Sequence, residues 1–136
     1  MKFLHTADWQ LGLPLRYLTS PSRAAEMRLY RYQTVQRIAA LALEQQVDFV
    51  LVAGDVLDDN ALGRDALQQA SDALRHFGST PVYLLPGNHD AATEDSALAR
   101  LELPLTVQVL ATREAVDVLG GRLWPGPWRR RHEMDD

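Results

Sequence analysis

The sequence predicts an α/β protein whose parallel sheet is built from strand–helix–strand crossovers. Three short apolar runs, at residues 2–6, 47–53 and 81–85, are typical of buried strands. Two longer segments with apolar residues at three- and four-residue steps separate these runs, and this alternation favours right-handed crossovers. A chain of 136 residues is the size of one hydrophobic core, so we expect a single domain over residues 1–136.

The first strand and the first helix have clear boundary signals. Residues 2–6 are apolar and aromatic and end shortly before Asp8. Ser20 followed by Pro21 is a typical helix start, because serine caps the first turn and proline fits within it. Apolar residues then recur with helical spacing as far as Gln46, which predicts one amphipathic helix or two joined helices.

The second and third strands flank a second helix. Residues 47–53 are nearly continuously apolar, which suits a strand covered on both faces. Residues 81–85 predict a third buried strand in the same way. Between these strands, apolar residues with helical spacing predict a helix that ends near Gly78: Leu62, Ala66, Leu67, Ala70, Ala73, Leu74 and Phe77.

The pattern weakens beyond residue 90. We expect a short helix at 94–101, a strand at 105–110, and a hairpin at 115–124 that turns at Gly120–Gly121. Residues 124–128 contain two prolines, which a central strand does not accommodate, so this segment is expected to be a loop.

Composition excludes several classes of protein. The chain has no cysteine, so it has no disulfide, zinc–thiolate site or thiol nucleophile, which fits the cytoplasm. No apolar stretch at the N-terminus has the length of a signal peptide or membrane span, so we expect neither export nor membrane insertion. The net charge of -4 argues against a simple electrostatic nucleic-acid binder, and Arg129–Arg131 is the clearest local basic patch.

A polar cluster follows each of the three predicted strands. These clusters are Asp8–Gln10, Gly54–Asp58 and Gly87–Asp90. Because ligands bind beyond the carboxyl ends of strands in open α/β sheets, we expect Asp8, Asp55 and Asn88 to gather at one edge.

The residue types of these clusters indicate a metal site. On an extended segment Asp8 and Gln10 would point to the same side and could hold one ion together. Gly54 and Gly87 would let the backbone turn out of each strand. Oxygen and imidazole donors without thiolate favour Mn²⁺, Mg²⁺, Fe²⁺ or Zn²⁺. Two such ions about 4 Å apart can clamp a phosphoryl group for in-line displacement, so phosphoester hydrolysis is the reaction class that the clusters favour.

Structural roles remain as alternatives for individual residues. Asp8 and Asp55 could cap helices, residues 87–90 could form an ordinary turn, and Asp58 could be a solvated loop acid. We expect His5 to be a packed or hydrogen-bonded core histidine. Trp124 and Trp128 could pack on their own domain or stack on nucleobases, and residues 129–131 could belong to a frayed tail or contact phosphates.

The three clusters resemble the first motifs of the calcineurin-like metallophosphoesterases, Asp-x-His, Gly-Asp-x-x-Asp and Gly-Asn-His-Asp/Glu. Residues 3–12, Phe-Leu-His-Thr-Ala-Asp-Trp-Gln-Leu-Gly, resemble in particular the Mre11/SbcD branch, the nuclease subunits that act in double-strand-break repair with a Rad50/SbcC-type ATPase. The resemblance extends to about residue 127. It implies a DNA substrate, that ATPase as partner, and two divalent ions, with Mn²⁺ expected first.

The resemblance also implies a role for each matching residue. Asp8 would bind the first ion, Asp55 would bridge the two ions, and Asn88 would bind the second. His89 would be the catalytic imidazole, and Asp58 would orient it. Asp90 is expected beside the ligands rather than among them.

Two departures from the family pattern affect what we expect. Gln10 stands where the family usually has a metal-binding histidine, and an amide oxygen is a weaker donor. The family's later Gly-His and Gly-His-x-His motifs have no counterpart, because His132 is the only histidine after His89.

Because of these departures, we expect the chain to form only a fragment of the family fold. We expect the first parallel-sheet half of a two-sheet sandwich, with flanking helices and the start of the second sheet, truncated at the C-terminus. An incompletely covered sheet face would then cause dimerisation or self-association.

The leading functional hypothesis is therefore a metal-dependent exonuclease or endonuclease subunit, inactive or weakly active as this chain alone. The alternatives are a non-catalytic assembly module of the same fold, and a phosphoesterase acting on nucleotides or phosphoproteins.

Overall fold

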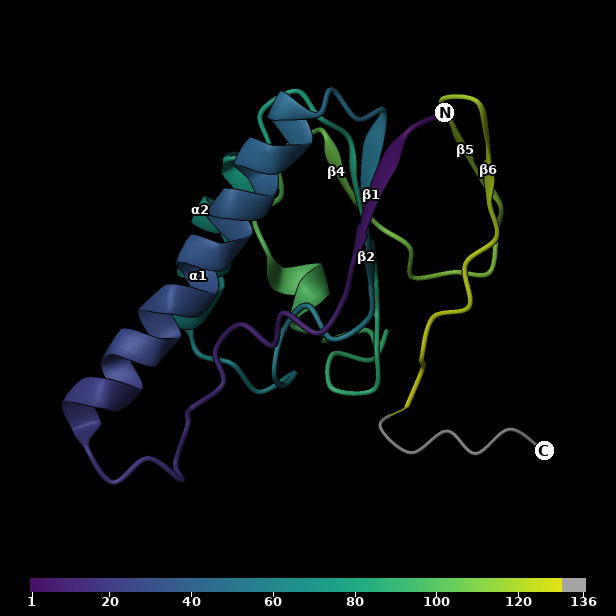
Figure 1. The fold of residues 1–136 in the computed structure, drawn as a ribbon. Coiled ribbons are helices and arrows are strands. Elements are labelled where there is room, and N and C mark those ends of the chain that lie inside the picture. Colours follow the sequence, from purple (N-terminus) through teal and green to yellow (C-terminus); the bar gives the residue numbers. More distant parts are fainter. Residues whose placement is uncertain (131–136) are drawn as a thin grey trace.

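A computed structural model describes residues 1–130 of the chain and shows an α/β fold with one main sheet (Figure 1). Four parallel strands form this sheet in the order β1-β2-β3-β4, and a separate antiparallel pair, β5-β6, follows. The elements in chain order are β1 (Phe3–Thr6), α1 (Pro21–Glu44), β2 (Phe49–Ala53), α2 (Arg64–Arg75), β3 (Val82–Leu85), the 3₁₀ helix η1 (Leu98–Arg100), β4 (Val107–Val109), β5 (Val116–Val118) and β6 (Gly121–Leu123). The predicted fold class and the predicted strand–helix alternation are confirmed.

The helix α1 is one continuous helix of 24 residues, which decides between the two alternatives for this segment. The Ser20 side chain accepts a hydrogen bond from the Arg23 N–H at 3.4 Å, and Pro21 occupies the first turn, as the sequence predicts. The helix ends at Glu44, and Gln46 turns the chain with a φ of 49°.

The helix α2 is shorter than its apolar pattern predicts. It covers Arg64–Arg75, so Leu62 precedes it and Phe77 follows it, although both residues pack on the core. Gly78 has a φ of 57° just beyond the helix, where a left-handed residue ends such segments.

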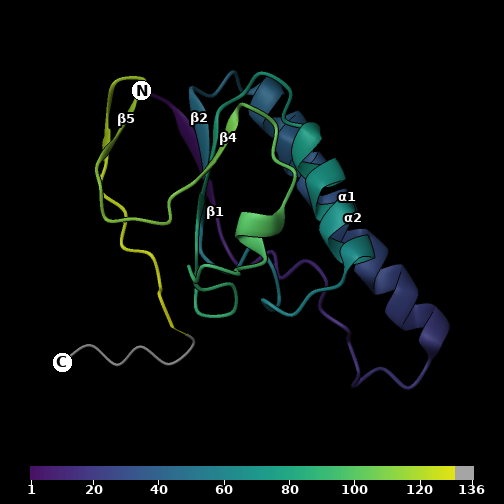
Figure 2. The ribbon, with the colours of Figure 1, turned by 180° about the vertical axis from the view of Figure 1, so that it is seen from behind.

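Both helices cover the same face of the sheet, while the β5-β6 pair lies on the other side (Figures 1 and 2). Within the sheet Val50, Val52, Val82 and Leu84 are each 0% exposed. In the edge strand β1, by contrast, Phe3 is 46% exposed and His5 is exposed. The expectation that His5 is a core histidine, packed or hydrogen-bonded, is therefore wrong, because its side of β1 is poorly covered.

The segment after residue 90 differs from the prediction in one element. The expected helix at 94–101 is reduced to η1, because short polar side chains accept hydrogen bonds from backbone N–H groups of this segment. Asn60 Oδ1 accepts the Ala97 N–H at 2.8 Å, and the Ser96 hydroxyl accepts the Ala99 N–H at 3.2 Å.

The last strands agree with the prediction within a residue or two. The strand expected at 105–110 is β4, which pairs in parallel with β3. The hairpin pairs Val118 with Gly121, so its turn is Leu119–Gly120, one residue earlier than expected. Gly120 has a φ of 84°, which is why glycine suits this turn. Within residues 1–130, no helix is both long and apolar enough to cross a membrane.

Candidate metal centre at the carboxyl ends of the strands

The loops that leave β1 and β2 run side by side. The Asp8 N–H donates to the Gly54 carbonyl at 3.1 Å, and the Gln10 N–H donates to the Asp55 carbonyl at 2.9 Å. A parallel bridge between Leu11 and Leu57 continues this pairing beyond the ends of the strands. The backbone of the first polar cluster is thus held directly against that of the second.

The loops that leave β2 and β3 meet through the Asp55 side chain. The backbone N–H of His89 donates to Asp55 Oδ1 at 3.0 Å. A Cβ atom added to Gly87 would overlap both the Asp55 carboxylate and its backbone nitrogen. Glycine is required at position 87 because of this close approach, not because of a left-handed φ, whereas Gly54 has a φ of 96°.

These loops enclose a cavity of about 230 Å³. Three of the predicted ligands, Asp8, Asp55 and Asn88, line it together. The remaining lining residues are Ala53, Gly54, Leu85, Pro86, Gly87, Gly126 and Trp128. The structure therefore brings two carboxylates and one amide, which are up to 80 residues apart in the sequence, to one hollow at the edge of the sheet.

Three candidate ligands have strained backbones. Asp8, Gln10 and Asp55 have φ values of 55°, 44° and 50°, a region that non-glycine residues seldom occupy. Such strain persists only where surrounding contacts enforce it, and it is common at functional sites. The extended conformation expected for Asp8 and Gln10 is wrong, and Gln10 is not among the residues that line the cavity.

His89 and Asp58 contact each other beside this cavity. His89 Nδ1 lies 2.8 Å from the Asp58 main-chain carbonyl oxygen and 3.9 Å from its carboxylate Oδ1. Because a carbonyl oxygen can only accept, Nδ1 is the donor, and Nε2 of the neutral ring is the acceptor. The geometry thus fixes one tautomer of His89.

Asp90 is a buried carboxylate that ties the second cluster to the third. It is 0% exposed, and it accepts the Leu57 N–H at 3.0 Å and the Gly87 N–H at 2.7 Å. Burial raises the pKa of Asp90 above its ordinary value, and these two hydrogen bonds offset part of that rise. Asp90 acts on the site through the backbone and does not line the cavity.

Sequence reasoning did not place Gly126 and Trp128 at the site. The Trp128 N–H donates to the Pro86 carbonyl at 3.2 Å, and the Trp128 carbonyl accepts the Ala92 N–H at 2.7 Å. An aromatic residue in a proline-containing loop was the only signal in the sequence. Of the predicted basic patch at 129–131, the last arginine lies outside the described residues, as does His132.

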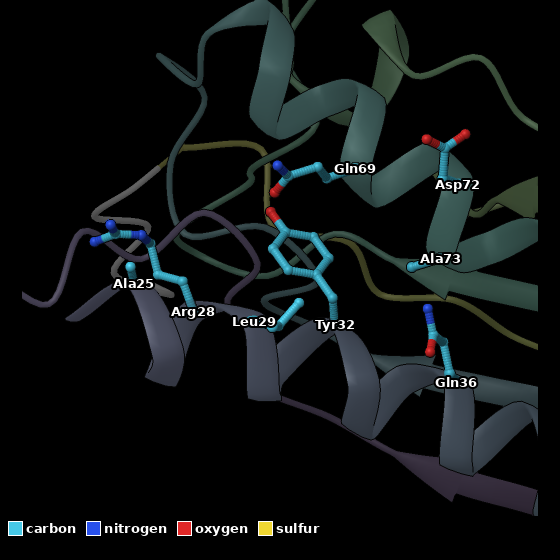
Figure 3. Close-up of a pocket in the computed structure, with 8 residues that line it drawn as sticks. All are labelled: Ala25, Arg28, Leu29, Tyr32, Gln36, Gln69, Asp72 and Ala73. Carbon is cyan, nitrogen blue, oxygen red and sulfur yellow. The ribbon is translucent and has the colours of Figure 1, made fainter. Parts of the chain in front are cut away.

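A larger hollow of about 440 Å³ lies between α1 and α2 (Figure 3). Tyr32 points from α1 toward Gln69 of α2, and burial raises the pKa of its hydroxyl above the ordinary value. Arg28 and Asp72 also line this hollow. It has a single carboxylate, so it does not offer the donor set that divalent ions require.

The donor chemistry of the smaller cavity fits a hard divalent ion. Asp8 and Asp55 supply carboxylate oxygens and Asn88 supplies an amide oxygen, which are ligands that Mg²⁺ and Mn²⁺ accept. Over residues 1–130, however, no group of three or more His, Cys, Asp or Glu side chains is arranged to hold a metal ion. The charged part of the donor set is therefore limited to two carboxylates.

The sequence of this chain matches the calcineurin-like phosphoesterase family over residues 1–129. The α/β fold agrees with this sequence match, and the chain belongs to this family. Members of the family typically bind metal ions. The predicted resemblance is confirmed at this level.

Relatives of the chain within the family carry the names of nuclease and repair proteins. It is 30% identical to the SbcD subunit of the SbcCD nuclease of Bacillus subtilis over 104 residues, which are 74% of this chain and 25% of the relative. It is 37% identical to the same protein of Staphylococcus saprophyticus over 94 residues, 67% of this chain and 23% of the relative. The DNA double-strand break repair protein Mre11 of Archaeoglobus fulgidus is 33% identical over 116 residues, 83% of this chain and 25% of the relative. The chain thus spans about a quarter of the length of these relatives.

Proposed function

We propose that this chain supplies Asp8, Asp55 and Asn88 to a two-metal phosphodiesterase centre that acts on DNA. The observation that carries the proposal is the shared cavity of Asp8, Asp55 and Asn88 at the carboxyl ends of β1, β2 and β3. The names of the relatives, which describe nuclease and double-strand-break repair proteins, support DNA as the substrate. Absence of cysteine and the DNA substrate together favour a cytoplasmic protein.

Each candidate ligand has a role in this proposal. Asp8 and Asp55 would hold the first ion, and Asp55 and Asn88 would hold the second, with Mn²⁺ as the expected metal. Bound ions would supply an activated hydroxide and neutralise charge on the phosphoryl group. Gln10 would add a weaker amide oxygen to the ligands of the first ion if its side chain turned toward the cavity.

His89 is the proposed catalytic imidazole. Its Nδ1 donates to the Asp58 carbonyl, so Nε2 is the nitrogen that can carry or accept a proton at the reacting phosphate. Its backbone N–H donates to one oxygen of Asp55, a residue of the cavity wall, and this contact supports a role for His89 beside the cavity. Asp58 is the residue that positions the ring in this scheme.

Calorimetric titration with Mn²⁺ and a hydrolysis assay on single-stranded DNA test the proposal. We expect two ions to bind with micromolar affinity, and we expect His89→Ala to abolish the weak hydrolysis of this chain while it retains ion binding. His76→Ala, which changes an exposed histidine at the end of α2, is the matched control. Faster hydrolysis of a nucleotide or a phosphopeptide than of DNA would overturn the assignment of substrate.

A non-catalytic assembly module is the second candidate. The exclusion of Gln10 from the cavity lining and the limit of two carboxylates favour it. Absence of Mn²⁺ binding in the same titration would support this candidate, whereas binding of two ions would exclude it.

Partners follow from the same proposal. The relatives' names indicate components of an SbcCD-type nuclease, and we propose a Rad50/SbcC-type ATPase as the partner of this chain. We also propose self-association through the sheet face that the helices leave open, where Phe3 is 46% exposed.

Light scattering at several protein concentrations tests self-association. Phe3→Lys should shift the chain toward monomer, and Leu43→Lys, on the exposed side of α1, should leave the association unchanged. A monomer at every concentration would contradict this proposal.

A further inference from the structure

The segment that ends at Trp128 is fixed against the third polar cluster on both sides. The Trp128 N–H bonds to the Pro86 carbonyl, just before Gly87–Asp90, and its carbonyl receives the Ala92 N–H, just after that cluster. These two hydrogen bonds, of 3.2 Å and 2.7 Å, hold the Trp128 backbone at the wall of the cavity.

The local sequence makes this placement stiff. Pro125 and Pro127 have fixed φ angles, and the residues that precede them are restricted to extended conformations. Pro127 is buried, so this stretch is anchored as well as stiff. The Trp128 backbone therefore needs little further ordering when a ligand reaches the cavity.

Trp128 differs from the buried tryptophan of the first polar cluster. Trp9 is 7% exposed, stacks on Phe77 with ring centroids 6.1 Å apart, and donates its indole N–H to the Thr6 hydroxyl. Trp128 is 39% exposed although it lines the cavity beside Asp8, Asp55 and Asn88. Packing within the domain accounts for Trp9 but leaves a large part of Trp128 in contact with solvent.

We propose that Trp128 is a stacking platform for the nucleobase next to the phosphodiester held in the cavity. An indole beside a phosphate site can stack on any base, which suits single-stranded nucleic acid without sequence preference. Two exposed arginines, Arg129 and Arg130, follow directly and supply positive charge near the flanking phosphates. This inference rests on the proposed function, and it makes Trp128 a determinant of substrate class.

Two oligonucleotides that differ only in their bases test the proposal on the full chain. The first is a short, fluorescein-labelled thymidine oligomer with phosphorothioate linkages to slow cleavage, and the second is the same oligomer without bases. Binding is measured by fluorescence polarisation with Mn²⁺ present, for the unchanged chain and for Trp128→Ala, Trp128→Phe and Trp124→Ala. Trp124 is the matched control, because it is 75% exposed and does not line the cavity.

Stacking predicts a loss of binding affinity that occurs only when the oligomer carries bases. Trp128→Ala should weaken binding of the thymidine oligomer by roughly 5- to 100-fold and leave the abasic oligomer unchanged. Trp128→Phe should retain part of the affinity, and Trp124→Ala should have no effect. A circular dichroism spectrum and a thermal melt of Trp128→Ala verify that the fold is retained.

The contrary outcomes separate this inference from the proposed function. Equal losses for both oligomers, or none for either, would overturn stacking while nucleic-acid binding stands. Failure of the unchanged chain to bind either oligomer would overturn both stacking and the DNA substrate.

Discussion

Two hollows within residues 1–130 differ in what lines them and in how their walls are held. The smaller one, about 230 Å³, gathers two carboxylates and an amide on loops that bond to one another. The larger one, about 440 Å³, lies between two helices and offers scattered polar groups (Figure 3). There Asp72 already pairs with Arg75 at 2.6 Å, and Arg28 donates to the Pro14 carbonyl at 3.2 Å.

This difference shows that volume alone does not locate the chemistry of this fold. Helix packing leaves a hollow wherever side chains fit imperfectly, and nothing requires its polar groups to converge. At the strand ends, three loops are pressed together closely enough to force left-handed φ values on Asp8 and Asp55. Variants within the three polar clusters should therefore differ sharply in their effects from matched variants outside these clusters, and four comparisons test this.

The largest difference in the free energy of unfolding is expected between variants of Asp90 and Asp72. Asp90→Ala leaves the buried N–H groups of Leu57 and Gly87 without their acceptor, which costs about 2–6 kcal/mol of the free energy of unfolding. Asp72→Ala removes an exposed ion pair and should cost less than about 1 kcal/mol. Urea unfolding followed by circular dichroism measures both values.

Asp90→Asn refines this first comparison. It retains one acceptor oxygen, so its stability should lie between those of the unchanged chain and Asp90→Ala. A loss for Asp90→Ala as small as that for Asp72→Ala would show that the buried carboxylate does not hold the two clusters together.

Variants of Asp55 and Tyr32 should differ in their affinity for Mn²⁺. Asp55→Asn removes a charged candidate ligand from the cavity, and we expect a loss of at least about 100-fold in Mn²⁺ affinity, since loss of an outer partner alone costs roughly 10–100-fold. Tyr32→Phe changes the larger hollow by one hydroxyl and should leave Mn²⁺ affinity unaltered. Calorimetry gives both constants, and equal affinities for the two variants would show that the ion binds elsewhere.

Two glycines of the same cavity wall provide the third comparison. Gly87→Ala forces a methyl group into the Asp55 carboxylate and backbone, whereas a Cβ at Gly126 meets no atom within 4 Å. Gly87→Ala should lower stability by about 1–3 kcal/mol and weaken Mn²⁺ binding, and Gly126→Ala should do neither. Thermal melts with and without Mn²⁺ measure both effects. Identical melts for the two variants would show that the loop at Gly87 shifts to accommodate the methyl group without displacing Asp55.

The fold could be predicted from the sequence because each strand is a short apolar run that ends at a polar cluster. The gathering of Asp8, Asp55 and Asn88 at one edge of the sheet could be predicted too, since it follows from parallel strands alone. Boundaries after residue 90 were less accurate, because the side chain of Asn60, from a distant loop, fixes the backbone at Ala97.

Several details of the site depend on contacts between segments that are far apart in the sequence, so the sequence does not predict them. The left-handed φ at Asp8 and Gln10 arises from pairing with the loop after β2, and no local signal in either residue encodes it. The need for Gly87 comes from the Asp55 side chain, 32 residues earlier in the sequence. The position of Trp128 depends on two long-range backbone hydrogen bonds, which residue pattern does not predict.

The smallest expected effect concerns Gln10, and it tests whether this position faces the first ion. Gln10→His introduces a stronger donor than a neutral amide and should raise Mn²⁺ affinity roughly tenfold, about 1.4 kcal/mol. Gln46→His is the matched control, because Gln46 has a similar left-handed φ, 49° against 44°, and lies after α1 away from the cavity. Calorimetric titration of both variants measures the difference. Equal affinities would mean that the backbone conformation at position 10 directs its side chain away from the ion, so that Asp8 is the sole ligand supplied by the first cluster.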